Sequence, residues 1–594
     1  MTVAPDQVNP SSPVATPSAP GKSLASHSLP SGRRLLVPVF LLLCFVVQCA
    51  WFAHTQSFTF DEPLHLTTGL HNWRFHRFDF VLEHPPLGHL LPALPIAFGN
   101  WDITWADATK KGILVTAITD PIGMAIRTRL VNVALGTTLG IFVWFVARNM
   151  FSEGAANLVL ALFAFSPSLI ANFSLVTTDG VTTLMVFLAA IQLLRWRKSP
   201  SVGQVLLLGL VLGLLLLSKL STPPVLCVAL ALMLVLKPDG WEWSPRLWNW
   251  HAMLTALVVA GLVLWGGYFF HVSRLKMGDG RVEMTFPNRE PFAKDSVGRI
   301  VGFMRRPLQH HMTLFVPAGE YLEGLADLVV HNQGGHKTFL LGQASDTQRP
   351  WFLPALALMK WPPIVILLST FGLVLLILRK VRAKIDLLVL FILPSCFLLF
   401  QIVLSKISTG ERHFLPVYPF VLLLCGATWE YAQATKKEAH PRGIMQKGTL
   451  TWLLVLGALL NAADVLRYAP GYLSYSNILI PNRVSYKYFS DSNLDWGQGL
   501  LALREYEQQH PNEKIWLSYF GSVDPAVYDV RATPLRVGER VSGTVVISGT
   551  NLAGEYVADP GFRWVTKYPL KTILDHCLFV YTVPPEAERG ESQN

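Results

Sequence analysis

Two adjacent carboxylates follow the first long apolar run of the sequence, in the stretch FDEPLHL. Asp61 and Glu62 lie where a chain that crosses a membrane would emerge, and Glu83 and His84 precede a Pro-Pro pair in the same polar segment. Carboxylates at a membrane boundary cost free energy unless another group pairs with them or uses them. Asp61 could instead cap a helix, and the prolines could simply stiffen a turn. Their position makes these four residues candidates for substrate chemistry.

Asp179, in the sequence TTDG, is a further acid that precedes an apolar run. If Asp61 and Asp179 converge, they could bind a divalent metal ion or hold the polar groups of an acceptor. The TTDG sequence is also a good N-cap for the run that follows. The histidines of the first polar segment lack the H-x3-H spacing of a helical zinc site. They are His65, His71, His76, His84 and His89.

Cations that could face a phosphate occur later in the chain. Arg412 and His413 stand at the start of a late apolar run, where an arginine can bind phosphate with two hydrogen bonds or merely extend to the interface. His336 and Lys337 end a long polar segment, and Lys360 precedes Trp-Pro-Pro at the start of another run. An ordinary polar loop and an interfacial anchor are the alternatives for these last three.

The composition predicts what kind of molecule carries these residues. Of 594 residues, 51% are hydrophobic and only 15% are charged, and the mean hydropathy is +0.38. These values predict a polytopic membrane protein rather than a soluble one. The formal net charge of +10 could indicate a nucleic-acid partner, but cytoplasmic loops also acquire Lys and Arg. The six cysteines, mostly in apolar runs, offer neither a disulfide framework nor a CxxC metal site.

Apolar runs that could cross a bilayer recur along the chain. With the N-terminus inside, loops rich in Lys and Arg alternate with loops that contain the candidate site residues, which the positive-inside rule explains without nucleic acid. This alternation predicts long non-cytoplasmic loops over 54–126 and 271–350. Residues 1–32 are rich in Pro, Ser and Ala and are predicted to be a disordered tail. The eleven predicted spans lie near 35–53, 129–147, 155–173, 181–194, 203–218, 222–236, 251–270, 361–378, 386–404, 414–430 and 449–466.

The chain therefore divides into a transmembrane domain over 33–466 and a separate α/β domain over 467–594. WGQGLLALREYEQQ has helical spacing, whereas KIWLSYFG, GTVVISG and HCLFVYTV are typical of strands. The parity of the spans places this domain on the non-cytoplasmic side. Asn493, Asp495 and Gln498 could contact an acceptor there, although Ser492 and Asp495 also fit a helix cap.

The order of the short motifs resembles the phospholipid-carrier-dependent glycosyltransferases. A first span that ends in DEPLHL, a later EHPPLGHLL, TTDG after the third span and GERHFLPVYPF at a late span carry the resemblance, which covers residues 35–430. The group includes the protein O-mannosyltransferases of glycosyltransferase family 39 and bacterial enzymes that transfer aminoarabinose to lipid A. The DSNLDWGQGLLALREY stretch is similar to the tail region of bacterial members.

The resemblance implies the GT-C architecture, with the active site in the first long non-cytoplasmic loop. It implies that Asp61 is the general base and that Glu62 orients the acceptor or a neighbouring donor. The donor would be a polyprenyl-phosphate sugar, and single displacement would pass its hexosyl or pentosyl group with inversion to a hydroxyl of a protein, lipid or glycan. The bacterial likeness implies the inner membrane, with the active site and the C-terminal domain in the periplasm.

Two other classes of function fit a membrane protein with charged groups near its spans. A secondary transporter would show interrupted helices, matching halves and polar groups near mid-membrane. A non-catalytic scaffold of the cell envelope would tolerate the loss of Asp61. The carboxylates gather at one predicted face without an internal repeat, which favours the enzyme. The sequence contains no GxGxxG, Walker A or GxSxG arrangement that would support nucleotide-driven or serine-hydrolase chemistry.

Overall fold

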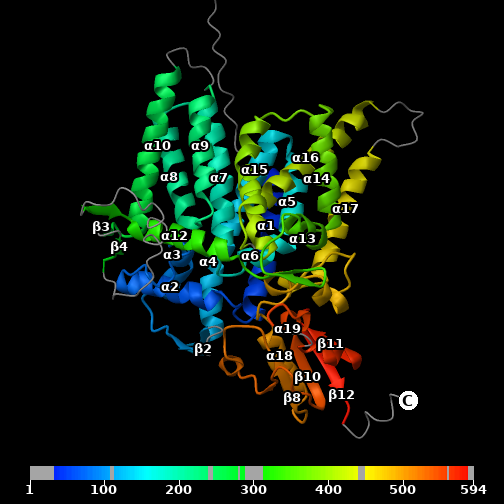
Figure 1. Cartoon of the computed structure of the whole chain (residues 1–594). Coiled ribbons are helices and arrows are strands. Elements are labelled where there is room, and N and C mark those ends of the chain that lie inside the picture. Colours follow the sequence, from blue (N-terminus) through cyan, green and yellow to red (C-terminus); the bar gives the residue numbers. More distant parts are fainter. Residues whose placement is uncertain are drawn as a thin grey trace, which may run out of the picture.

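A helical body and a smaller strand-containing region below it make up the molecule (Figure 1). The computed structural model describes residues 32–107, 113–237, 245–278, 281–287, 312–407, 409–438, 448–557 and 561–585. Residues 1–31, which make up nearly all of the predicted tail, lie outside these ranges. The fold class predicted from the sequence, a polytopic α-helical membrane protein with a small C-terminal α/β region, is confirmed.

Each predicted span coincides with a helix or with a bent pair of helices. Runs rich in Leu, Val and Ala, with few interior charges, form these helices because their backbone hydrogen bonds are satisfied within the segment. By length and composition, six described helices can cross a membrane, or eight if each of two bent pairs counts as one span. Shorter apolar helices account for the remaining runs. The helices are α1 (Gly32–Thr55), α4 (Pro121–Met150), α5 (Glu153–Ala164), α6 (Pro167–Phe173), α7 (Thr178–Lys198), α8 (Val202–Ser218), α9 (Pro223–Val235), α10 (Pro245–Gly267), α13 (Phe352–Lys360), α14 (Pro363–Ile377), α15 (Leu387–Val403), α16 (Tyr418–Glu438) and α17 (Thr449–Leu466).

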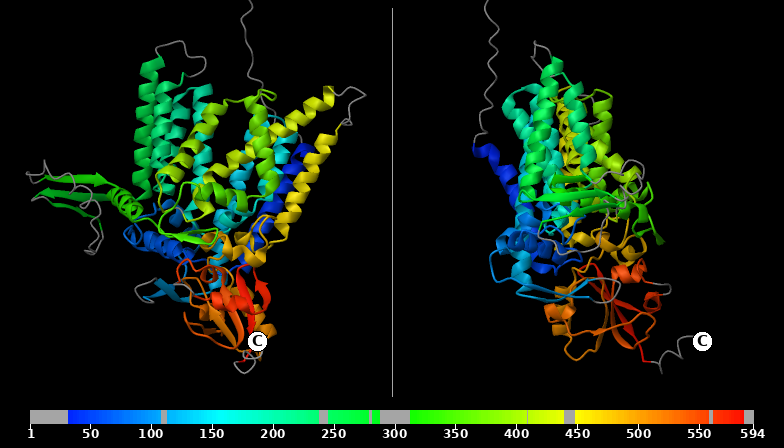
Figure 2. Two further views of the ribbon diagram at one scale, coloured as in Figure 1. Left: turned by 45° about the vertical axis from the view of Figure 1, so that its right-hand side comes forward. Right: turned by 60° about the vertical axis from the view of Figure 1, so that its left-hand side comes forward.

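Proline and serine residues set the two bends. Helices α5 and α6 meet at 61°, where Ser166 caps α6 and Pro167 begins it. Helices α13 and α14 meet at 116° across Pro362 and Pro363. A residue before proline is displaced from the helical region, which ends one helix and begins the next. Because of the second bend, α13 lies across the end of the bundle nearest the C-terminal region (Figure 2).

The polar segments between the spans gather at this same end of the bundle. Helices α2 (Glu62–Phe75) and α3 (Leu87–Ala93) lie there beside α12 (Gly319–Gly334) (Figures 1 and 2). Gly69 permits the close contact of α2 with α3, since a Cβ at this position would lie 2.4 Å from the His89 carbonyl oxygen. Small sheets accompany these helices: β1 (Ile103–Asp107) with β2 (Ile113–Ile118), β3 (Val272–Gly278) with β4 (Arg281–Thr285) and β5 (Met312–Pro317), and β6 (Thr338–Leu340) with β7 (Gln343–Ser345).

The C-terminal region contains a five-stranded sheet with the order β11-β12-β10-β8-β9. Strands β8 and β10 are parallel, and β12 pairs antiparallel with β10. The helix predicted before the first strand is α18 (Leu500–Gln509), and the three predicted strands are β8 (Ile515–Ser518), β10 (Gly543–Ser548) and β12 (Leu578–Val583). The two other strands are β9 (Thr533–Pro534) and β11 (Leu570–Leu574).

The core of this region is continuous with the helical body. Tyr472 and Trp496 belong to the hydrophobic cluster that the spans form. Phe352 of α13 packs in one cluster with Phe579 of β12. The predicted separate domain therefore shares its buried surface with the spans, which fixes its place at the end of the bundle.

Candidate active site

Asp61 lies at the start of α2. It occupies the N-cap position, but its carboxylate makes no capping hydrogen bond. Oδ2 instead accepts a hydrogen bond from Arg412 Nη2 at 3.3 Å. The alternative role of Asp61 as a helix-capping acid is therefore not seen, and the carboxylate is left at the polar end of the bundle.

Asp61 is the first of four charged side chains that alternate in sign. Arg412 Nη1 lies 3.6 Å from Asp179 Oδ2, and Lys219 Nζ lies 2.5 Å from Asp179 Oδ1. Arg412 comes from the 3-10 helix η2 (Glu411–Val417), Asp179 from the first turn of α7, and Lys219 from the C-cap of α8. The sequence thus predicted correctly that Asp61, Asp179 and Arg412 lie at one end of the bundle, and the structure brings them into contact.

The two carboxylates of this chain differ in their access to a ligand. The Asp61 side chain is 28% exposed, whereas that of Asp179 is 1% exposed. Thr177, rather than Asp179, is the N-cap residue of α7. Asp179 therefore holds the cations in place, and Asp61 is the acid that an incoming group can reach.

A cavity of about 400 Å³ opens beside these charges. Its polar lining residues include Asp61, His84, Lys219, Arg412 and His413, and its apolar lining residues include Leu328 and Val329 of α12 and Phe400 of α15. The lining residues are Asp61, Glu83, His84, Thr178, Lys219, Leu220, Ser221, Leu328, Val329, His331, Asn332, Gln333, His336, Phe400, Gln401, Leu404, Ser405, Ile407, Thr409, Arg412 and His413. Six of the sequence-predicted site residues thus face one cavity.

Three nitrogen atoms of residues that line this cavity are buried without a hydrogen-bond partner in the described part of the chain. They are His84 Nδ1, Arg412 Nε and His413 Nε2. A buried polar group without a partner costs about 1–3 kcal/mol. Arg412 Nε always carries a proton, and an imidazole nitrogen donates when it carries one. Together with the Lys219 ammonium, these atoms suit a ligand with several anionic oxygens.

The protonation of Asp61 depends on its surroundings. Burial raises the pKa of Asp61, Arg412 opposes this change, and the neighbouring Asp491 and Asp179 add to it. Burial and the nearby His65, Lys219 and Arg412 hold the pKa of His84 well below its ordinary value, so that its ring is neutral. Asp61 is thus a stronger base than an ordinary aspartate, beside imidazoles that carry no charge.

Glu62, predicted to orient an acceptor, lies outside the cavity. It forms a fully buried ion pair with Arg129 of α4, with Oε2 2.6 Å from Nη2. Oε2 also accepts from the Thr59 backbone N–H at 2.8 Å, and Oε1 accepts from that of Val176 at 2.9 Å. Both carboxylate oxygens are used inside the protein, so Glu62 holds the first loop against α4 and the segment before α7.

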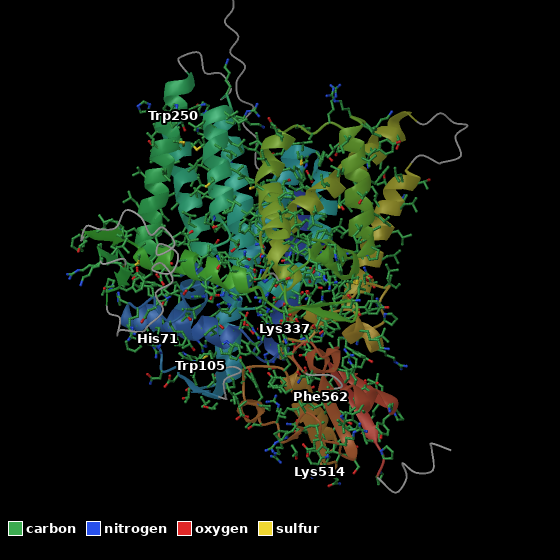
Figure 3. The ribbon with its side chains drawn as sticks, in the orientation of Figure 1. His71, Trp105, Trp250, Lys337, Lys514 and Phe562 are labelled. Carbon is green, nitrogen blue, oxygen red and sulfur yellow. The ribbon has the colours of Figure 1, made fainter. Side chains whose placement is uncertain are left out.

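Only some of the residues predicted to bind phosphate line the cavity. Lys360 is buried away from the cavity, where Nζ donates to the carbonyl oxygens of Leu473 at 2.8 Å and Asn493 at 2.7 Å. Lys337 is exposed at the junction of the helical body and the C-terminal region (Figure 3) and does not line the cavity, whereas His336 does. Glu83, also on the wall, pairs with His331 Nδ1 at 2.8 Å.

Three histidines of the first polar segment pack together. His65 Nδ1 lies 2.9 Å from His89 Nε2, and the ring of His84 is 5.2 Å from that of His65. Nevertheless, the described residues include no group of three or more His, Cys, Asp or Glu that could hold a metal ion. The proposed metal ligands Asp61 and Asp179 both contact Arg412, so a divalent ion would have to displace the guanidinium. This donor set does not fit a metal ion.

Lys219 is a site residue that sequence reasoning missed. It is the lone cation between two apolar runs, in the sequence LLSKLST. By the predicted alternation of loops, that turn lies on the same side as Asp179. These two observations were a signal, since a cation at such a boundary needs a partner. Asn493, Asp495 and Gln498 were candidates for acceptor contact, but all three are buried and bonded within the protein.

Comparisons with known proteins agree with the resemblance seen in the sequence. A family model described as dolichyl-phosphate-mannose-protein mannosyltransferase matches residues 114–265. That segment contains Asp179 and Lys219 and confirms the predicted resemblance there. A search of curated protein sequences finds no match.

Several solved structures are similar to the chain. The protein O-mannosyltransferase complex of S. cerevisiae, bound to its sugar donor, is 11% identical, with 83% of this chain and 96% of that chain covered and a TM-score of 0.49. ArnT from Cupriavidus metallidurans, bound to undecaprenyl phosphate, is 10% identical, with 93% and 98% covered and a TM-score of 0.43. The oligosaccharyltransferase AglB from Archaeoglobus fulgidus, in complex with an inhibitory peptide and a dolichol-phosphate, is 11% identical, with 85% and 64% covered and a TM-score of 0.43.

Proposed function

We propose that this protein is a membrane glycosyltransferase that moves a sugar from a polyprenyl-phosphate donor to an acceptor hydroxyl, with Asp61 as the general base. The observation that carries the proposal is the alternating chain of Asp61, Arg412, Asp179 and Lys219, of which Asp61, Arg412 and Lys219 line the cavity. It combines an accessible carboxylate with two fixed cations in one place.

The cavity matches the two parts of a lipid phosphate. Arg412 and Lys219 supply positive charge, and His84 and His413 supply nitrogen atoms for the phosphate oxygens. An apolar wall, formed by Leu328, Val329, Phe400, Leu404 and Ile407, suits the first isoprene units. Val329 and Leu404 are also largely exposed, so this wall continues onto the apolar outer surface.

The chemistry requires one proton acceptor and one stabilised leaving group. The acceptor oxygen attacks the anomeric carbon of the sugar while its proton passes to the Asp61 carboxylate. The bond between the anomeric carbon and the phosphate oxygen breaks, and the lipid phosphate leaves with the electron pair, opposite Arg412 and Lys219. A single displacement inverts the anomeric centre. The leaving phosphate is stable as an anion and needs no general acid.

The distribution of charge along the helices supports a non-cytoplasmic active site. Helix α7 begins near Asp179 and ends with Arg195, Arg197 and Lys198, which places the basic residues at the opposite end of the bundle. Cytoplasmic ends of spans carry such an excess of Lys and Arg. We place the cavity and the C-terminal region in the periplasm of a bacterial inner membrane. The acceptor is a hydroxyl of a protein, lipid or glycan, and the sugar is a hexosyl or pentosyl group.

A secondary transporter is the main alternative, and the breaks within α5–α6 and α13–α14 would suit it. The positions of the charged residues favour an enzyme over a transporter. Asp61, Asp179, Lys219 and Arg412 lie at one end of the bundle rather than at its middle, and Asp61 starts a helix that does not cross the membrane.

Sugar transfer by membranes that contain the Asp61→Asn variant tests the proposal. We expect transfer from a polyprenyl-phosphate sugar to fall about 10²–10⁴-fold, because the amide cannot take the acceptor proton. Asp120→Asn is the matched control, since Asp120 is an exposed N-cap of α4 at the same end of the bundle and asparagine also caps well. Wild-type transfer by Asp61→Asn would exclude Asp61 as base, and transport without transfer by the unmodified protein would favour the alternative.

A further inference from the structure

The DSNLDWGQ segment, residues 491–498, is the part of the C-terminal region that reaches the candidate active site. It is buried where the helical body meets the sheet, and Trp496 is only 2% exposed. Its side chains and carbonyl groups contact the backbone next to both Asp61 and Arg412. These contacts involve residues more than 80 positions apart in the sequence.

On one side, the segment holds the chain that leads into Asp61. The Trp496 carbonyl oxygen accepts from the Phe60 backbone N–H at 2.8 Å, immediately before the catalytic candidate. The Gln498 carbonyl oxygen accepts from the Ser57 backbone N–H at 3.0 Å, and Ser57 Oγ donates to the Gly497 carbonyl at 2.9 Å. The position of the Asp61 backbone is therefore set by residues 496–498.

On the other side, Asn493 holds the chain that leads into Arg412. Asn493 Oδ1 accepts from the Glu411 backbone N–H at 2.9 Å, and Nδ2 donates to the Thr409 carbonyl at 3.0 Å. One asparagine side chain thus fixes the two residues on either side of Gly410. A Cβ on Gly410 would lie 2.5 Å from Ser492 Oγ, so the two chains approach closely.

The Trp496 ring completes the arrangement by contacting the Arg412 side chain directly. The guanidinium carbon lies 4.3 Å from the ring centroid. A cation over an indole face is attracted to it, most strongly where water is excluded. Two edges of the guanidinium face the carboxylates of Asp61 and Asp179, and the ring restrains it from a third direction.

The segment is itself rigid. The Trp496 backbone N–H donates to Gln498 Oε1 at 2.7 Å, and Gln498 Nε2 donates to the Leu494 carbonyl at 3.1 Å. Gly497 has a φ of +93°, and a Cβ there would lie 2.8 Å from Tyr519 Oη. Any residue with a side chain would have a strained backbone at this position, even if there were room for the side chain. The segment can therefore transmit a fixed geometry to both of its contacts.

We propose that the 491–498 segment is a positioning element of the active site and that Trp496 is a positioning residue that fixes the Arg412 guanidinium beside Asp61. The inference rests on the proposed function and adds a role for the C-terminal region to it. Trp496 does not line the cavity and acts through Arg412. The C-terminal region thereby completes the catalytic centre of the helical body.

Trp496→Leu and Trp496→Phe test this role in the full-length protein. Leucine removes the aromatic face, whereas phenylalanine keeps a smaller one. We expect Trp496→Leu to lower kcat/KM for the polyprenyl-phosphate sugar at least ten-fold, since small misplacements of a charged group reduce rates strongly. Trp496→Phe should retain more activity than Trp496→Leu. Equal activity of wild type and Trp496→Leu would overturn the proposal.

The pH profile separates positioning from simple loss of stability. Arg412, Asp179 and Asp491 are the charged groups that act on Asp61, and only Arg412 lowers its pKa. A loosened guanidinium should therefore move the acid limb of kcat/KM to higher pH in Trp496→Leu and less so in Trp496→Phe. A fall in activity with an unmoved acid limb would assign Trp496 a structural role only.

Trp516→Leu is the matched control, because the Trp516 ring also faces a cation, with Lys514 Nζ 4.1 Å from the centroid. Lys514 lies at the end of the C-terminal region far from the spans (Figure 3). We expect this variant to lose stability without a shift of the acid limb. A shift of the same size as in Trp496→Leu would contradict the positioning role.

A double-mutant cycle on thermal unfolding tests the contact without any assay of transfer. If Trp496 holds Arg412, the losses in Tm for Trp496→Leu and Arg412→Gln should not add in the double variant. Additive losses in Tm would show that Trp496 does not hold Arg412. If wild type transfers no sugar but the cycle is non-additive, the proposed function fails while the positioning of Arg412 stands.

Discussion

Arg412 links the two carboxylates of the candidate site, Asp61 and Asp179. Its two terminal nitrogens face Asp61 and Asp179, its guanidinium lies over the Trp496 ring, and its buried Nε has no hydrogen-bond partner among the described residues. Arginine suits this position because its guanidinium is always charged and planar, with five donors in a fixed geometry. A lysine ammonium could not contact both carboxylates and the Trp496 ring in the same fixed geometry.

Lys219→Gln should weaken donor use. Lys219 supplies the second cation of the cavity, and its loss also leaves Asp179 with only the longer contact to Arg412. We expect kcat/KM for the polyprenyl-phosphate sugar to fall about ten-fold or more, as for other charge-assisted contacts worth about 1.5–3 kcal/mol. Lys406→Gln is the control, an exposed lysine near the cavity that does not line it. Unchanged kinetics of Lys219→Gln would remove it from the donor site.

The rate should depend on pH through Asp61. The base acts only when ionised, and burial raises the pKa of Asp61 above the ordinary value of 3.8. The acid limb of kcat/KM should therefore lie above pH 3.8, with activity lost as the pH falls through it. Arg412→Gln should move the limb further upward, because the group that lowers this pKa is gone. A limb at or below pH 3.8 would contradict the described environment of Asp61.

At the scale of elements, the buried pair of Glu62 and Arg129 ties α2 to α4. Arg129 also donates to the backbone carbonyls of Ala53 at 3.0 Å, Gln56 at 2.8 Å and Ser57 at 2.9 Å, which closes the turn between α1 and α2. The direction in which Asp61 points follows from this turn. Glu62 thus contributes to the site from behind it rather than from within the cavity.

Glu62→Gln should therefore be strongly destabilising. Breaking a fully buried pair leaves an uncompensated charge, which typically costs about 3–5 kcal/mol. Thermal unfolding of the purified protein in detergent would show this as a lowered Tm. Glu505→Gln, at an exposed position of α18, should leave the Tm nearly unchanged. Equal Tm values for the two variants would show that the buried pair is not needed.

The spans could be predicted because apolar runs of sufficient length leave the chain few other options in a membrane. The alternation of basic loops then placed Asp61, Asp179 and Arg412 at one end of the bundle. The inward turn of Glu62 could not be predicted, because its partner Arg129 lies 67 positions later inside an apolar run. The sequence alone does not distinguish the roles of the adjacent acids Asp61 and Glu62, because the buried partner of Glu62 is visible only in the structure.

At the scale of the whole molecule, the C-terminal region is joined to the first loop by buried polar contacts. Asp575 Oδ1 accepts from Gln56 Nε2 at 3.1 Å, across 519 positions of sequence. The sequence predicted the strands of this region but not its junction with the bundle. Contacts between such distant residues leave no periodic signal, and this is why the role of the 491–498 segment became visible only in the structure.

Two acids at this junction should contribute less to stability as the pH rises, because they retain protons in the folded protein. Burial raises the pKa of Asp575 to about 8 and that of Glu555 to about 8. A raised carboxyl pKa gives stability that is complete below the unfolded pKa near 4 and is lost as the pH rises through about 8. The contribution of these two acids to the free energy of unfolding should therefore decline between pH 4 and pH 8, whereas the contribution of buried neutral histidines such as His84 changes in the opposite direction.

Asp575→Asn should make this decline shallower, since an amide keeps the hydrogen-bonding size without titrating. Asp529→Asn is the control, an exposed residue of the same region with a left-handed backbone that asparagine tolerates. The measurement is the Tm of each variant across the pH series. The same slope in wild type and Asp575→Asn would show that Asp575 does not carry the effect.

A cryo-electron-microscopy structure of the protein with polyprenyl phosphate would test the central claim most directly. We predict density for the phosphate within hydrogen-bonding distance of both Arg412 and Lys219, with the first isoprene units against Leu328, Val329 and Leu404 and the Asp61 carboxylate open beside the phosphate. Lipid phosphate bound at another place, with the cavity beside Asp61 empty, would contradict the account.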